Sequence, residues 1–224
     1  MAMKAMTKKI FWQDAYLTNL ETSVIQVDGC DVVLESTIFY AESGGQESDQ
    51  GTIGGWPVHQ AKKNDQDIVY TEDQGHELKV GDFVNVKIDG NRRYKLMRLH
   101  FAAEIVLELF YKTQPGIEKI GAHISETKAR IDFLRQGSIA SLLNDIRQKA
   151  IDLIQSDQPI ISAFSDENAQ RRYWMIDGFS KVPCGGTHLK RTSEIGSIRL
   201  KRENVGKGKE RVEIFLDGTG PKGL

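Results

Sequence analysis

The stretch Pro183-Cys184-Gly185-Gly186-Thr187-His188 carries a thiol and an imidazole four positions apart, joined by two glycines. Glycine adopts conformations that other residues avoid, so this turn lets the backbone fold round a single point. Far upstream, His100 and Glu104 show the same four-residue spacing inside an apolar pattern of helical period. Residues four apart on a helix lie on one face. The two pairs predict that a mid-chain helix and a late glycine turn meet around one ion.

Zinc in proteins is bound by Cys, His and carboxylate side chains, usually in a tetrahedron. Each pair alone is a weak signal, because a lone His beside an apolar helix face is more often a core residue. In a chain with only two Cys and five His, the two pairs together favour a shared site. The expected ion is zinc (Zn2+), and the expected ligands are His100, Glu104, Cys184 and His188.

The length of 224 residues allows one large domain or two small ones, and 39% apolar and 27% charged residues are typical of a globular protein. No apolar run approaches the ~20 residues that cross a bilayer. The first nine residues contain no apolar signal core, and two cysteines cannot form a disulfide framework. We therefore expect a cytoplasmic protein with no membrane partner. The sequence leaves the oligomeric state open, with a monomer slightly favoured.

The hydrophobic period changes near residue 91. Before it, short alternating segments and turns predict a small β-barrel-like domain over residues 1–90. After it, a helix is expected up to Pro115 with Asp89 or Asn91 as N-cap, and a second helix from Ser138 as N-cap to Pro159. With a hairpin near the C-terminus, these elements predict an α+β domain over residues 91–224, with an antiparallel sheet and two main helices. The expected strands are residues 22–27, 31–34, 51–59, 68–71, 82–88, 129–133, 160–164, 173–176, 194–202 and 210–216.

Positive charge is concentrated late in the chain, where residues 190–211 hold eight Lys or Arg against three Glu. A solvated hairpin face has this composition, and so does an edge that binds a polyanion. The candidates for such binding are Arg199, Lys201, Arg202, Lys207, Lys209 and Arg211.

The segment Met97-Arg98-Leu99-His100-Phe101-Ala102-Ala103-Glu104, followed by Pro183-Cys184-Gly185-Gly186-Thr187-His188-Leu189, resembles the paired motif of alanyl-tRNA editing domains. These domains occur in alanyl-tRNA synthetases and as free-standing AlaX proteins. Residues 37–46, with Asp49 and Gly51, are similar to the family's glycine-rich segment, and residues 128–133, 193–196 and 206–209 also fit in the same order. The resemblance covers nearly the whole chain, and a barrel-like first domain is the arrangement of the mid-length AlaX class.

The resemblance implies hydrolysis of misacylated tRNA(Ala), chiefly Ser-tRNA(Ala) and also Gly-tRNA(Ala), by a zinc-containing proofreading factor that acts in trans. Such a second check is needed because a pocket for alanine rejects a close analogue by only ~1–3 kcal/mol. The resemblance further implies that Thr37 reads the serine hydroxyl, that Gln46 acts close to the ester, and that the basic hairpin contacts tRNA phosphates.

Position 104 departs from the family pattern, which usually reads His-x-x-x-His where this chain has Glu104. We prefer Glu104 as a fourth ligand, because the position is a ligand position in the family motif. In the alternative, three residues hold the ion, a water takes the open place, and Glu104 acts on that water as a base. Two other functions are rivals: a tRNA-binding module with structural zinc and no turnover, and a zinc hydrolase of another substrate such as a peptide, for which the H-E-x-x-H helix is missing.

Overall fold

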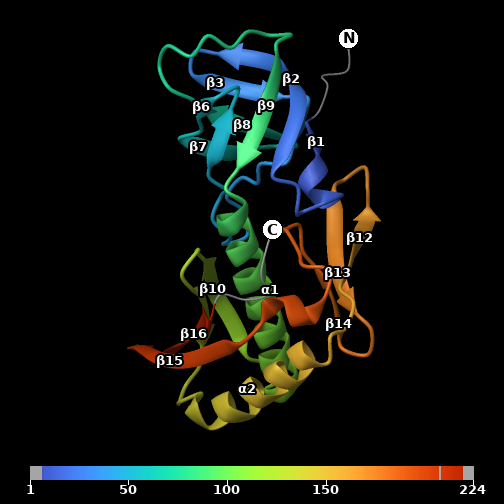
Figure 1. Cartoon of the computed structure of the whole chain (residues 1–224). Coiled ribbons are helices and arrows are strands. Elements are labelled where there is room, and N and C mark those ends of the chain that lie inside the picture. Colours follow the sequence, from blue (N-terminus) through green and yellow to red (C-terminus); the bar gives the residue numbers. More distant parts are fainter. Residues whose placement is uncertain (1–6, 207, 219–224) are drawn as a thin grey trace. The chain divides into compact units, whose positions relative to one another are not determined.

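The computed structural model describes residues 7–206 and 208–218. Within these ranges the chain is α+β, with two α-helices and mainly antiparallel sheets (Figure 1). The described residues form two compact units: residues 7–43 and 47–94 (unit 1), and residues 44–46 and 95–218 (unit 2). The α+β class is confirmed, whereas the division into domains at residues 90 and 91 stays a prediction.

Unit 1 contains an antiparallel sheet that curls into half a barrel. Its strand order among the described residues is β6-β5-β9-β2-β3-β8-β7, so β6 and β7 are edges and the sheet does not close on itself. Alternate side chains, including Val32, Ile53, Tyr70 and Val86, are buried and form its core. The strands are β2 (Asn19–Asp28), β3 (Asp31–Leu34), β5 (Gly51–Ile53), β6 (Trp56–Pro57), β7 (Gln60–Asn64), β8 (Asp67–Thr71) and β9 (Phe83–Ile88). A parallel pair, β1 (Lys8–Lys9) and β4 (Ser36–Thr37), and a 3-10 helix, η1 (Ile10–Trp12), complete the unit.

The single strand predicted over residues 51–59 is wrong. β5 and β6 instead pair with each other around Gly54 and Gly55, whose φ values of 61° and 92° reverse the chain. β7 was not predicted, because only Ala61 of its residues is buried and the strand shows no apolar alternation.

Asp89 caps helix α1 (Gly90–Thr113), because its Oδ1 accepts a hydrogen bond from the N–H of Arg92 at 3.0 Å. Within unit 2 the helix is buried on more than the one face that its apolar period predicts. The ring of Phe101 packs against Trp174 and the ring of Phe110 against Phe133, so neighbours from two different sheets cover the helix. Among the described residues, no helix is long and apolar enough to span a membrane.

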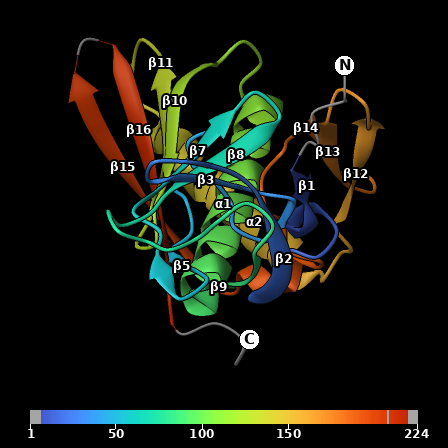
Figure 2. The ribbon, with the colours of Figure 1, turned by 90° about the horizontal axis from the view of Figure 1, so that it is seen from above.

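Two sheets and a second helix make up the rest of unit 2. The hairpin sheet has the strand order β10-β11-β16-β15, and Figure 2 shows these strands side by side. The small sheet has the order β12-β13-β14 and is orange in Figure 1. The elements are β10 (Glu118–Ile124), β11 (Ala129–Leu134), α2 (Ala140–Gln155), β12 (Ile161–Asp166), β13 (Arg171–Ile176), β14 (Ser180–Pro183), the 3-10 helix η2 (Thr192–Ile195), β15 (Ile198–Gly206) and β16 (Lys209–Leu216).

Two expectations in unit 2 need correction, and one strand was missed. Ser138 is not the N-cap of α2, because the helix begins after Ile139; its Oγ still accepts a hydrogen bond from the N–H of Ala140 at 3.0 Å. The strand predicted from residue 194 begins only at Ile198, since Gly196 at a φ of 71° separates η2 from β15. Strand β14, which leads to Cys184, was not predicted.

Candidate metal centre

Helix α1 and the loop after β14 bring three metal-binding side chains together. Sγ of Cys184 lies 3.5 Å from Nε2 of His100 and 3.2 Å from Nε2 of His188. Donor atoms of all three residues lie within 4.8 Å of one another. Typical zinc bond lengths place a sulfur and a nitrogen about 3.6 Å apart in a tetrahedral site. The donor types and their spacing therefore fit a single zinc ion.

The second glycine of the motif is needed for space. Strand β14 pairs with β13, and the N–H of Cys184 extends this ladder by donating to the carbonyl of Arg172 at 2.9 Å. A Cβ on Gly186 would fall 2.0 Å from Cε1 of His100. Neither Gly185 nor Gly186 is among the residues of positive φ. Gly186 thus permits the close approach of the His100 ring, whereas the sequence suggested a backbone turn.

Glu104 lies beside this group. Its Oε1 is 3.5 Å from Nε2 of His100, and its Oε2 accepts a hydrogen bond from Nε1 of Trp174 at 3.0 Å. It is not one of the three residues whose donor atoms lie within 4.8 Å of one another. Its role as a ligand or as a base stays a prediction.

The surroundings of the centre shift the pKa values of its two histidines in opposite directions. Burial lowers the pKa of His100, but the Cys184 sulfur and the Glu104 carboxylate outweigh it and raise that pKa to about 10. Burial lowers the pKa of His188 well below its ordinary value, and the positive charges of His100 and Arg172 lower it further. Burial raises the pKa of Glu104, but hydrogen bonds from His100 and Trp174 bring it below its usual range. These surroundings therefore favour the neutral form of His188, which is the form that binds a metal, and the protonated form of His100.

Gln46 is held next to the metal centre within unit 2. The carbonyl of Gly45 accepts a hydrogen bond from the N–H of Ile124 at 2.7 Å, which holds residues 45 and 46 beside β10. Nε2 of Gln46 donates to Oγ1 of Thr187 at 3.1 Å, one residue before His188. Its Oε1 is buried and has no hydrogen-bond partner among the described residues. A buried acceptor without a donor destabilises the folded state, unless a bound molecule donates a hydrogen bond to it.

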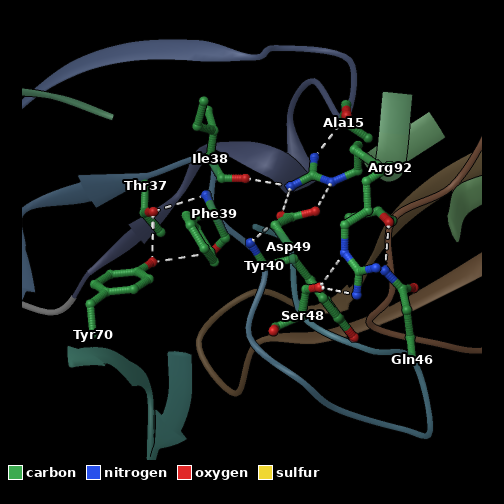
Figure 3. A network of polar contacts seen from close by, with 12 residues as sticks. Ala15, Thr37, Ile38, Phe39, Tyr40, Gln46, Ser48, Asp49, Tyr70 and Arg92 are labelled. Atoms are coloured by element: carbon green, nitrogen blue, oxygen red, sulfur yellow. Dashed lines mark hydrogen bonds and ion pairs between the residues drawn. The ribbon is translucent and has the colours of Figure 1, made fainter. Parts of the chain in front are cut away.

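Thr37 belongs to unit 1, where its side chain is fully buried. Its Oγ1 accepts a hydrogen bond from the N–H of Phe39 at 3.0 Å and lies 2.7 Å from Oη of Tyr70, as Figure 3 shows. The Tyr70 hydroxyl in turn donates to the carbonyl of Phe39 at 3.1 Å. The hydroxyl of Thr37 thus closes a local network, and its reading of serine stays a prediction.

Sequence reasoning missed a buried ion pair in unit 1. Both side chains of Asp49 and Arg93 are fully buried, and Nε of Arg93 donates to Oδ1 of Asp49 at 2.9 Å. Arg93 also donates to the carbonyls of Ala15 and Ile38. Oδ2 of Asp49 accepts a hydrogen bond from the N–H of Tyr40 at 2.7 Å (Figure 3). The pair ties the start of α1 to the glycine-rich segment, and only its burial, which a sequence does not show, distinguishes it from surface charges.

The basic hairpin of β15 and β16 is largely paired with acids. Arg202 binds both carboxylate oxygens of Glu210, at 2.5 and 2.6 Å, and Arg211 binds Asp132 in the same way. Two further pairs are longer, at 3.5 Å: Arg199 with Asp217, and Lys201 with Glu213. The Arg199 and Lys201 side chains are 52% and 61% exposed, and Lys209 is exposed too, whereas Lys207 lies outside the described residues. The exposed cations are therefore the more accessible candidates for contact with phosphate.

Comparison with known proteins gives two family matches. The family described as tRNA synthetases class II (A) matches residues 4–92. The family described as threonyl and alanyl tRNA synthetase second additional domain matches residues 172–213, which include Cys184 and His188.

Relatives match along almost the whole chain. The alanyl-tRNA editing protein AlaX-M of Pyrococcus horikoshii is 33% identical, with 95% of this chain and 99% of the relative aligned. AlaX-M of Saccharolobus solfataricus is 33% identical over 92% of this chain and 98% of its own. The alanine–tRNA ligase of Methanopyrus kandleri is 32% identical over 93% of this chain, but this is 26% of the ligase. Identity at this level over nearly the full length of both chains shows that the protein belongs to the AlaX-M family of alanyl-tRNA editing proteins.

Proposed function

We propose that the protein hydrolyses the ester between a wrong amino acid and tRNA(Ala), acting in trans on Ser-tRNA(Ala) and Gly-tRNA(Ala). The observation that carries this proposal is the convergence of His100, Cys184 and His188 in a chain of the AlaX-M family. A separate hydrolytic site is physically useful because a binding pocket discriminates poorly between small amino acids, by ~1–3 kcal/mol.

The metal proposed is zinc, because one sulfur and two imidazole nitrogens form a donor set that zinc favours. When bound, zinc supplies a positive charge that can polarise the ester carbonyl or lower the pKa of a bound water. The part of the protein is to hold the ion: His100 from α1, and Cys184 and His188 from the loop after β14. A set of three protein ligands leaves one position for water or substrate, as in many catalytic zinc sites.

Glu104 has two roles that one substitution separates. As a ligand it closes the site, and as a base it accepts a proton from the attacking water. The grouping of three donors without Glu104 supports the base role. Glu104→Gln keeps the size of the side chain. Retained zinc with lost turnover would favour the base, whereas loss of bound zinc would favour ligation; metal content and deacylation are measured on the same sample.

On the substrate side, we propose that Oε1 of Gln46 accepts a hydrogen bond from the bound aminoacyl group, since this atom is buried without a partner in the described structure. Thr37 remains the proposed reader of the serine hydroxyl. The comparison of Thr37→Val with Thr37→Ser tests this role, because the serine variant keeps the hydroxyl. The valine variant should lose preference for Ser-tRNA(Ala) over Ala-tRNA(Ala), and the serine variant should retain it. An unchanged preference in Thr37→Val would remove Thr37 from the specificity site.

Deacylation of Ser-tRNA(Ala), Gly-tRNA(Ala) and Ala-tRNA(Ala) by the full-length protein tests the function directly. We expect rapid loss of serine, slower or no loss of alanine, and no serine loss in Cys184→Ala. If the protein binds tRNA but cleaves no ester faster than buffer does, it is a binding module. Hydrolysis of an unrelated substrate that excess tRNA does not inhibit would favour the third class, a hydrolase of another substrate.

A further inference from the structure

The small sheet contacts the metal centre with two polar side chains. Ser162 of β12 and Trp174 of β13 are direct cross-strand partners, so their side chains lie on the same face of the sheet. Oγ of Ser162 lies 2.8 Å from Nδ1 of His188, and Nε1 of Trp174 donates to Glu104. One strand pair therefore contacts both His188 and Glu104.

Backbone pairing holds the start of β12 beside the segment that carries His188. Pro159 and Arg191 form an antiparallel bridge, and the N–H of Ile160 donates to the carbonyl of Lys190 at 2.8 Å. In antiparallel pairing, each step forward on one strand matches one step back on the other. Ser162 follows Pro159 by three residues and His188 precedes Arg191 by three, so this pairing brings the two segments that carry Ser162 and His188 close together.

The chemistry of a histidine ligand gives this contact a role. Nε2 of His188 faces the sulfur of Cys184, at 3.2 Å, and must be unprotonated to bind a metal. The ring proton then resides on Nδ1, which donates to Oγ of Ser162. A partner of this kind fixes both the tautomer and the plane of a metal-binding imidazole, and its loss typically weakens metal binding ~10–100-fold.

We propose that Ser162 is a positioning residue of the metal centre, which orients His188 toward the ion through the Nδ1 hydrogen bond. The inference rests on the proposed metal site, but not on the reaction assigned to it. Phe101 limits the ring from another direction, with its own ring edge-on to His188 at a centroid distance of 5.7 Å.

The exposure of Ser162 decides which substitutions are informative. Because the residue is exposed, a water molecule can take the place of the hydroxyl in an alanine variant. Threonine and valine avoid this ambiguity, since they have the same shape and differ only by the hydroxyl. Both also favour β-strands, so neither should disturb β12.

The test measures the affinity of the full-length protein for Zn2+ and Co2+ by competition with a chelator, with the Co2+–thiolate absorption as a signature of Cys184 ligation. We expect Ser162→Thr to bind within about threefold of the parent, and Ser162→Val to bind ~10–100-fold more weakly. Ser165→Val, on the same edge strand, is the control and should match the parent. Equal affinities in the threonine and valine variants, whether high or low, would overturn the proposal. Ser-tRNA(Ala) hydrolysis by the parent protein is a separate readout, so failure of this inference is distinct from failure of the proposed function.

Discussion

Gly186 lies so close to His100 that no side chain fits between them. A Cβ at this position would come within 2.0 Å of Cε1 of the imidazole, whereas a Cβ on the preceding Gly185 would meet no atom within 4 Å. Neither glycine has a positive φ, so alanine is compatible with the backbone at both. Alanine substitutions at the two adjacent positions therefore form a matched pair, because only the one at Gly186 interferes with the His100 ring.

We predict that Gly186→Ala displaces the His100 ring and weakens metal binding by at least about tenfold, the scale seen when the support of a metal ligand is removed. Gly185→Ala should bind metal as the parent does. Chelator competition on the two variants measures the difference. Equal metal affinity in both variants would show that the close contact between the His100 ring and residue 186 does not determine metal binding.

Glu72 provides a second prediction for a single residue. Its side chain is 2% exposed, and neither carboxylate oxygen has a hydrogen-bond partner among the described residues. Burial, and then the charge of Asp73, raise its pKa to about 8. Between the ordinary pKa near 4.5 and about 8, the folded state keeps a proton that the unfolded state has lost. The contribution of Glu72 to the free energy of unfolding is thus fully present below pH 4.5 and is lost as the pH rises to 8.

Glu72→Gln removes the ionisation and keeps the shape. We expect the melting temperature of the variant to exceed that of the parent by roughly 2–6 °C at pH 8, with a smaller difference at pH 5. Thermal unfolding at several pH values measures both. A difference between variant and parent that does not change with pH would contradict the prediction.

At the scale of elements, the hairpin sheet carries two kinds of basic side chain, which differ in exposure and in the length of their ion pairs. Arg202 is paired closely with Glu210, which is 4% exposed, whereas Lys201 and Arg199 are more than half exposed and their ion pairs are longer. Surface ion pairs of the second kind contribute little to stability, so their cations can turn to phosphate at small cost.

We predict that Arg199→Ala and Lys201→Ala weaken tRNA binding and each reduce the slope of log affinity against log salt by about 1. Arg202→Ala should instead lower the free energy of unfolding, because it removes both side-chain hydrogen bonds that Arg202 donates to the buried Glu210. Filter binding at several salt concentrations and urea unfolding provide the two readouts. An unchanged salt slope in the first two variants would exclude the hairpin as a tRNA contact.

At the scale of the whole molecule, the metal centre joins segments that are far apart in the chain, since His100 and Cys184 are 84 residues apart. An ion bound only by the folded state stabilises it by ~2.7 kcal/mol at a concentration one hundred times its dissociation constant. For a chain of this length, this corresponds to a rise in melting temperature of roughly 5–10 °C.

Metal removal should therefore lower the melting temperature by that amount, and added zinc should restore it. In Cys184→Ser, the response to chelator and to zinc should be much smaller. Calorimetry of the parent and the variant, with and without chelator, makes the comparison. A parent protein whose melting does not respond to chelator would contradict a zinc ion at this site.

Much of the organisation follows from local sequence. The four-residue spacing places His100 and Glu104 on one helical face, and the structure has their side chains 3.5 Å apart. The period of α1, its cap at Asp89 and the late hairpin are local patterns too, and the structure confirms them. Local sequence fixes such features because each depends on residues only a few positions apart.

Tertiary structure alone decided the surroundings of the centre. Ser162, Trp174 and Thr187 reach it through strand register and loop docking, which depend on pairings between residues distant in sequence. The burial of Asp49 with Arg93, and the lack of space for a side chain at Gly186, are likewise properties of packing. The sequence by itself determined which side chains could bind a metal and on which elements they lie. Only the folded chain determined which of them meet and what holds them, because each such contact depends on many distant segments packing together.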